Sequence, residues 1–241
     1  MNALSNPDTP EVLCSITTAA SIGDPSMDWR IAVQDTVQLG IKRFALFLTG
    51  LKPTERKNCY QLLLTHRLRH EFEIPFVHAR SDMHPDEYRF LMHEFGTKRF
   101  NLHPVRKAEL PEGGLPDDLR RLIYIENVGK LLESDLNGFA GICLDISHLE
   151  ITRRVYPEYY PTLCAMIENH RVGANHVSAY QNEGKGDGRD DKHHYVSITE
   201  FDYLKAYPKE YFGRYVAIEL TNPLSEQLAV KSLLENHLNL I

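Results

Sequence analysis

Short apolar runs recur along this chain and alternate with longer segments of helical periodicity. The run at 142–144 is too short for a helix and lies between Gly141 and Asp145. Such runs are typical of parallel strands that are buried on both faces. The pattern predicts strands at 12–17, 44–48, 74–78, 99–103, 122–125, 142–144, 174–179 and 215–218.

Most of these strands are separated by segments in which apolar residues recur at helical spacing. The first helix is expected to begin at Ser26 or Asp28 and to end at Gly40, and the second to run from Pro53 toward Phe72. Residues 107–118 show little sign of a long helix. Further helices are predicted at 85–95, 128–136, 159–170, 198–207 and 224–238.

Strands that alternate with helices in this way predict a (β/α)₈ TIM barrel, as one domain over residues 1–241. Residues 1–10 are polar and are expected to be loosely ordered. An open doubly wound sheet is the alternative fold. Such a sheet usually has a Gly-rich phosphate-binding turn after its first strand, and this sequence has none.

The composition, 42% hydrophobic and 25% charged, is that of an ordinary globular protein. No apolar run is long enough to span a bilayer, and the first residues do not resemble a secretory signal. The four cysteines show no C-x-x-C spacing, which favours a reducing, cytoplasmic location. The net charge of −6 argues against a broad nucleic-acid surface. A homo-oligomer is compatible with these features.

Side chains that can bind metal ions lie at the ends of the predicted strands from the third strand onward. They are His78, His103, Glu126, Asp145 with His148, His176 and Glu219. The carboxyl ends of barrel strands meet at one edge, so we expect these groups to converge. Carboxylates and imidazoles suit Zn²⁺, Mn²⁺, Mg²⁺ or Fe²⁺, and buried acidic groups need a compensating cation. The alternative is a set of unrelated polar strand ends.

Four of these strand ends resemble the xylose isomerase-like TIM-barrel superfamily. They read Ile-Glu-Asn at 125–127, Leu-Asp-Ile-Ser-His at 144–148, Asn-His-Val at 175–177 and Ile-Glu-Leu at 218–220. The resemblance extends over nearly the whole chain from the second strand on. That superfamily includes sugar isomerases and epimerases, inosose dehydratases and the endonuclease IV branch of DNA repair.

The epimerase branch holds one divalent metal ion with four ligands, and the resemblance assigns these roles to Glu126, Asp145, His176 and Glu219. It also implies that His148 contacts a substrate oxygen. In such a site the metal polarises a carbonyl group, while the two glutamates flank the carbon whose proton moves. The catalytic residues implied are Glu126, Glu219 and His148.

The endonuclease IV branch holds three zinc ions with a larger ligand set. The resemblance offers matches for the additional ligands at His78, His103, His148, Asp191 and His193. A multi-metal site stabilises both the attacking and the leaving oxygen of a phosphodiester. The negative net charge of the chain and the short loops after the first four strands favour the sugar branch instead.

The segment 181–194 is rich in glycine and charge. It is expected to be either a lid that closes on the substrate or a solvated loop. Within it, Lys185 and Arg189 are candidates for binding an anionic group of the substrate.

The sequence therefore predicts a metal-dependent isomerase or epimerase that acts on a small sugar, sugar phosphate or polyol derivative, with Mn²⁺, Mg²⁺ or Zn²⁺. A small carbohydrate is the expected partner, rather than nucleic acid or a membrane. The alternative is an endonuclease IV-like zinc phosphodiesterase acting on abasic DNA. A third reading is a metal-stabilised binding protein without catalytic activity.

Overall fold

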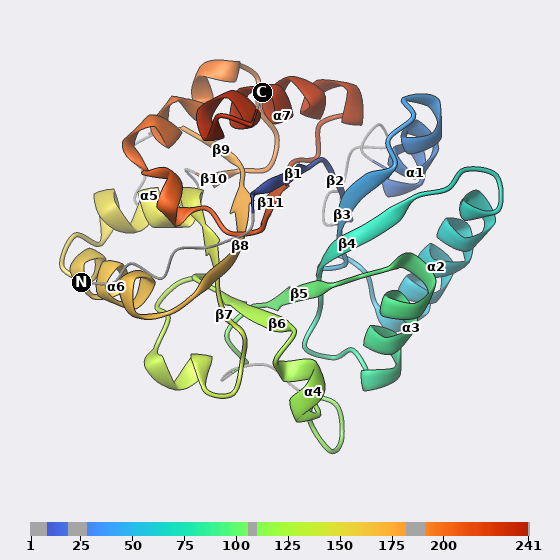
Figure 1. Ribbon diagram of the computed structural model, residues 1–241, viewed down its shortest axis with the longest axis horizontal. Coiled ribbons are helices and arrows are strands. Elements are labelled where there is room, and N and C mark those ends of the chain that lie inside the picture. Colours follow the sequence, from blue (N-terminus) through green and yellow to red (C-terminus); the bar gives the residue numbers. More distant parts are fainter. Residues whose placement is uncertain (1–8, 19–27, 106–109, 182–190, 241) are drawn as a thin grey trace.

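The computed structural model describes residues 9–18, 28–105, 110–181 and 191–240. Within them, a parallel sheet of nine strands begins with β1 (Glu11–Leu13) and ends with β2 (Ser15–Thr17). These two are consecutive parts of the predicted first strand, separated only by Cys14. β1 pairs with β11 (Tyr215–Ile218) and β2 pairs with β3 (Arg43–Phe47), so the first strand joins both edges of the sheet. The sheet is therefore a closed barrel (Figure 1).

The remaining strands follow one another around the barrel in chain order, and every neighbouring pair is parallel. They are β4 (Glu73–His78), β5 (Arg99–Leu102), β6 (Ile123–Glu126), β7 (Gly141–Asp145) and β8 (Val172–Val177). With β1 and β2 counted as one, the sheet has the eight positions of a TIM barrel. The predicted (β/α)₈ fold is confirmed, and the open doubly wound sheet is wrong.

Helices surround the strands (Figure 1). They are α1 (Trp29–Gln38), α2 (Pro53–Arg67), α3 (Pro85–Phe95), α4 (Asp117–Arg120), α5 (Ile146–Val155), α6 (Tyr160–Asn169) and α7 (Leu224–Leu238). The 3₁₀ helices η4 (Glu133–Leu136), η5 (Ile198–Ala206) and η6 (Lys209–Tyr211) and a small antiparallel pair, β9 (Ala179–Tyr180) with β10 (Asp191–Lys192), complete the described elements. None of the helices in these ranges is both long enough and apolar enough to cross a bilayer.

The structure differs from the predicted helices in two places. The helix expected at 128–136 is only the 3₁₀ turn η4, because Gly129 has a positive φ of 61° that a right-handed helix does not contain. α5 begins directly after Asp145, in a segment for which the sequence predicted no helix. Asp145 itself caps that helix by accepting a hydrogen bond from the backbone N–H of His148.

The alternation of side chains along each strand decides what lies inside the barrel. Leu13, Ala45, Phe47, Phe76, Tyr124, Cys143, Ala174, Tyr215 and Ala217 form one buried cluster, apart from the larger core. Their outward neighbours, such as Phe44, Leu46, Ile125 and Val216, belong to that larger core. A residue two positions after an inward residue also points inward. The strand ends therefore direct the candidate ligands into the barrel, next to the buried cluster of interior side chains.

Gln227 of α7 closes the barrel where the first strand passes from β1 to β2. Its Oε1 accepts a hydrogen bond from the Ser15 backbone N–H at 2.8 Å. Its Nε2 donates to the carbonyl oxygens of Ser15, Leu220 and Asn222 at 3.1, 3.3 and 3.0 Å. One buried amide thus satisfies backbone groups on both sides of the seam.

Candidate metal centre

The carboxyl ends of four neighbouring strands bring together Glu126, Asp145, His176 and Glu219. One potential ligand atom of each side chain lies within 4.8 Å of those of the other three. All four residues are buried, and the most exposed of them, Glu219, has a relative exposure of 6%. His176 Nδ1 lies 3.2 Å from Glu126 Oε2 and 3.2 Å from Glu219 Oε2. The arrangement has the composition and size of a site for one divalent cation.

The electrostatics of this cavity call for a positive charge. Burial lowers the pKa of His176, but Cys143, Glu126 and Glu219 outweigh it and hold that pKa well above its ordinary value. Burial raises the pKa of the Cys143 thiol to about 12, so this group is neutral near pH 7 and the two carboxylates supply the negative field. Either an imidazolium or a bound cation can balance them.

The directions of the ligand atoms favour the cation. Neither ring nitrogen of His176 has a hydrogen bond of good geometry among the described residues, although Nδ1 lies close to two carboxylates. Atoms that approach one another without hydrogen-bond geometry can instead share a metal ion at a common point. The residues present therefore fit a divalent metal.

Asp145 is held by its neighbours in both its side chain and its backbone. Its Oδ1 accepts hydrogen bonds from Ser147 Oγ at 2.6 Å and from the His148 N–H at 2.8 Å. The side-chain amide of Asn127 accepts from the Asp145 N–H at 2.7 Å and donates to the Asp145 carbonyl at 3.0 Å. This support fixes where the carboxylate enters the cavity.

His78 lies next to Glu126 on the opposite side from Asp145. Its Nδ1 is 3.1 Å from the Ala79 carbonyl oxygen, which can only accept, so Nδ1 carries a hydrogen and Nε2 is the ring nitrogen that faces Glu126. That Nε2 lies 3.0 Å from Glu126 Oε2. His78, Glu126 and His176 form a second group of potential ligands whose atoms lie within 4.8 Å of one another.

Three other histidines predicted from the sequence lie around the same carboxylates. His103 Nε2 is 3.8 Å from Glu126 Oε2, His148 Nδ1 is 3.7 Å from Glu126 Oε1, and His193 Nε2 is 3.9 Å from Glu219 Oε1. Burial lowers the pKa of His103, which favours the neutral form that binds metals. The structure thus places all four histidines that the sequence puts at or just after strand ends around Glu126.

The remaining predicted residues lie in or beside the segment 182–190, which is outside the described residues. Lys185 and Arg189 belong to it, as does most of the expected lid at 181–194. The backbone of Asp191 belongs to β10, and its side chain is not among those described.

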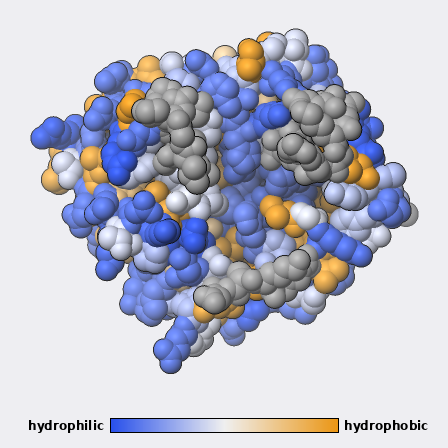
Figure 2. All heavy atoms as spheres, turned by 180° about the vertical axis from the view of Figure 1, so that it is seen from behind, coloured by the Kyte–Doolittle hydropathy of each residue, from blue (hydrophilic) through white to orange (hydrophobic). Residues whose placement is uncertain are grey.

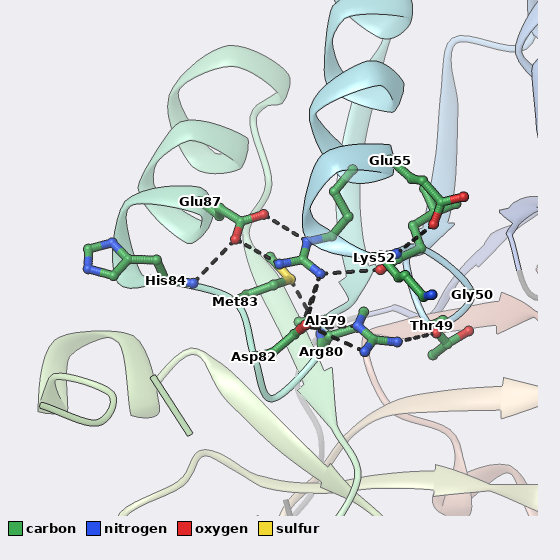
Figure 3. Close-up of polar contacts among 12 residues, drawn as sticks. Thr49, Gly50, Lys52, Glu55, Ala79, Arg80, Asp82, Met83, His84 and Glu87 are labelled. Carbon is green, nitrogen blue, oxygen red and sulfur yellow. Dashed lines mark hydrogen bonds and ion pairs between the residues drawn. The ribbon is translucent and has the colours of Figure 1, made fainter. Parts of the chain in front are cut away.

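The buried side chain of Arg56 joins the loop after β3 to the loop after β4, whose Asp82 and the nearby Glu87 are labelled in Figure 3. Arg56 has a relative exposure of 0% and donates to both carboxylate oxygens of Glu87 at 2.9 Å, from Nε and Nη2. Its Nη1 donates to Asp82 Oδ1 at 3.1 Å and to the Leu51 carbonyl oxygen at 3.2 Å. The network therefore ties α2 and the loop after β3 to the loop after β4.

The sequence did not nominate Asn101 or Ser147, both of which contact candidate ligands. Asn101 Nδ2 donates to Glu126 Oε2 at 2.9 Å. Asn101 precedes His103 by two positions, so the alternation of strand side chains could have identified it. It was missed because amides are less typical ligands than histidines and carboxylates.

One face of the molecule is hollowed near its centre, and the hollow is lined by hydrophilic residues (Figure 2). This face is opposite to the one seen in Figure 1.

Comparison with known proteins gives likenesses of fold only. No family model and no curated protein matches the sequence. The chain is similar to the crystal structure of the probable 3-DHS dehydratase AsbF, involved in petrobactin synthesis, from Bacillus anthracis. The two are 11% identical, with 92% of this chain and 98% of that chain covered and a TM-score of 0.49. It is also similar to protein SMc04130 from Sinorhizobium meliloti 1021, with 13% identity, 93% and 97% coverage and a TM-score of 0.42. These values give neither a family nor an activity to this chain.

Proposed function

We propose that this protein is a divalent-metal-dependent enzyme of the xylose isomerase-like group that isomerises or epimerises a small sugar, sugar phosphate or polyol derivative. The observation that supports this is the buried convergence of Glu126, Asp145, His176 and Glu219 within 4.8 Å. It occurs at the carboxyl edge of the strands, where TIM barrels have their active sites. The motifs at these strand ends resemble those of the same group.

In the proposed reaction the two glutamates have the main roles. Glu126 and Glu219 each place an oxygen 3.2 Å from His176 Nδ1, so they approach the centre of the site from different strands. One carboxylate accepts a proton from a substrate carbon and the other returns one to it or to its neighbour. His148, beside Glu126 Oε1, binds a substrate hydroxyl. A bound metal ion supplies polarisation of the substrate carbonyl.

The test combines metal analysis with proton exchange. Protein purified without added metal should contain about one Mn²⁺ or Mg²⁺ per chain if it has the one-ion site of this proposal. Incubated in D₂O with a panel of ketoses and ketose phosphates, it should incorporate deuterium at carbon. Glu126→Gln and Glu219→Gln should each slow this exchange by at least ~10²-fold. Glu133→Gln is the matched control, because Glu133 is exposed and pairs with His170. A chain that exchanges no proton in any of these substrates would contradict the proposal.

A second candidate is a zinc phosphodiesterase that acts on abasic DNA. The observation that favours it is the separation of 3.0 Å between His78 Nε2 and Glu126 Oε2, in a group that also includes His176. In this candidate Glu126, His78 and His103 would hold a second metal ion, whose charge would stabilise the attacking and leaving oxygens of the phosphodiester. A one-metal epimerase does not require these two histidines as ligands.

A duplex with one abasic site distinguishes the two candidates. A phosphodiesterase should contain two or three Zn²⁺ per chain, as its multi-metal chemistry requires. It should also incise the duplex beside the abasic site. Incision should be lost in His103→Ala and Asp191→Ala but retained in His93→Ala, an exposed histidine paired with Glu94 on α3. Intact duplex together with one bound ion would exclude this candidate.

A further inference from the structure

We propose that Asn101 is a positioning residue that sets the orientation of the Glu126 carboxylate for metal binding, an inference that rests on the proposed metal centre. Asn101 lies in β5, between His78 of β4 and Tyr124 of β6 in the strand register. Its relative exposure is 0%. Its side-chain Nδ2 donates a hydrogen bond of 2.9 Å to Glu126 Oε2.

The chemistry of the pair fixes which way the amide faces. An ionised carboxylate only accepts hydrogen bonds, so the NH₂ group of Asn101, and not its oxygen, must face Glu126. A carboxylate that binds a metal ion is ionised. The donation from Asn101 Nδ2 to Glu126 Oε2 agrees with this orientation of the amide.

This orientation has a cost for the folded protein. Asn101 Oδ1 is buried and has no hydrogen-bond partner among the residues that the structure describes. A buried amide oxygen without a partner disfavours folding, whereas an apolar side chain of similar size in the same place does not. The unpartnered oxygen offsets part of what the hydrogen bond to Glu126 contributes to stability, so the clear effect of Asn101 is on Glu126.

That effect is to select one rotation of the carboxylate. Three nitrogen atoms lie within 3.2 Å of Oε2, since it is also 3.0 Å from His78 Nε2 and 3.2 Å from His176 Nδ1. The hydrogen bond from Asn101 occupies one lone pair of Oε2. The other lone pair would be available to a metal ion, and Oε1 lies on the side of His148. Partners that orient a metal ligand in this way typically change metal affinity by about 10–100-fold.

The position of Asn101 is itself well fixed. Its backbone carbonyl oxygen accepts a hydrogen bond from the Ala79 N–H at 3.0 Å, which holds β5 against the end of β4. The amide therefore acts from a rigid strand, as precise ligand support requires.

The experiment measures Mn²⁺ binding to the metal-stripped full chain by calorimetry, together with the Tm of the same metal-free samples. Asn101→Leu should lower Mn²⁺ affinity about 10–100-fold, whatever its effect on the metal-free Tm. Asn101→Ala, a smaller change, should show the same direction of affinity loss if the leucine variant does not fold. Thr97→Val is the matched control, because Thr97 is buried just before β5 and its Oγ1 donates to the Ile74 carbonyl at 2.8 Å. It should lower the Tm and leave the affinity unchanged.

Affinity that is unchanged in the folded Asn101 variants would overturn the inference while leaving the proposed function intact. A lower metal-free Tm with unchanged affinity would likewise show that Asn101 is only structural. Wild-type protein that binds no Mn²⁺ would overturn both the inference and the metal-dependent function, so the two failures are distinguishable.

Discussion

At the scale of single residues, Asp145 combines a structural and a candidate metal-binding role in one side chain. Its Oδ1 caps α5 and accepts the hydroxyl of Ser147. The same residue belongs to the group of four potential ligands. The two roles make different demands, because a cap needs only an acceptor oxygen, whereas a metal ligand benefits from the negative charge.

Asp145→Asn and Asp145→Ala should separate these roles. Asparagine caps a helix about as well as aspartate, so the metal-free Asn variant should keep its free energy of unfolding, while the Ala variant should lose ~0.5–2 kcal/mol. Both should bind Mn²⁺ at least ~10-fold more weakly. Guanidinium unfolding of metal-stripped protein and Mn²⁺ titration measure the two effects. An Asn variant that binds Mn²⁺ as tightly as the wild type would remove Asp145 from the ligand set.

At the scale of elements, Glu150 joins α5 to Tyr207, the residue that directly follows η5. Its side chain is buried and accepts hydrogen bonds from Arg153 Nε at 2.9 Å and from Tyr207 Oη at 2.6 Å, and also from Arg154. Burial raises the pKa of Glu150, but the hydrogen bonds from Arg153, Tyr207 and Arg154 outweigh burial and lower that pKa to about 2. The helix and the 3₁₀ segment are therefore coupled through an ionised carboxylate.

This coupling predicts a specific pH dependence of stability. The pKa of Glu150 is lower in the folded than in the unfolded chain, so its stabilisation is fully present above the unfolded pKa of about 4.3. It should be lost as the pH falls from there toward 2. The difference in free energy of unfolding between wild type and Glu150→Gln should thus shrink over this range in urea titrations. Glu158→Gln, an exposed glutamate just beyond α5, is the control and should follow the wild type at every pH. A Glu150→Gln difference that is constant with pH would contradict this account.

At the scale of the whole molecule, closure of the barrel depends on the seam at the first strand. There the strand leaves β11 and begins to pair with β3, so its backbone changes partners between Leu13 and Ser15. Gln227 supplies hydrogen bonds to both sides of this change. A closed sheet has no exposed edge, and the seam is the place where that closure is completed.

Gln227→Met should weaken the closure. Methionine has a similar volume but leaves the Ser15 N–H and several carbonyl oxygens without their partner, so we expect a loss of about 2–4 kcal/mol in the free energy of unfolding. Gln34→Met, on the exposed face of α1, is the matched control and should change that energy by less than ~0.5 kcal/mol. Denaturant titrations measure both variants. Equal effects of the two substitutions would show that the amide of Gln227 is not needed at the seam.

The amino-acid sequence by itself determined the strands, their order and the end of the barrel at which the candidate ligands lie. Parallel strands that are buried on both faces appear as short apolar runs, and their carboxyl ends must share one edge. Glu126, Asp145, His176 and Glu219 could therefore be nominated as neighbours although they are far apart in the chain. Helix type was less predictable, because α5 depends on a cap and η4 on the conformation of Gly129.

Only the tertiary structure decided which atoms face one another. The hydrogen bond from Asn101 to Glu126, the approach of His78 to the same oxygen and the closure by Gln227 all join residues on different elements. Their distances depend on the strand register and on the curvature of the closed barrel. A local pattern of polar and apolar residues does not contain either quantity, because register and closure result from the packing of the whole chain.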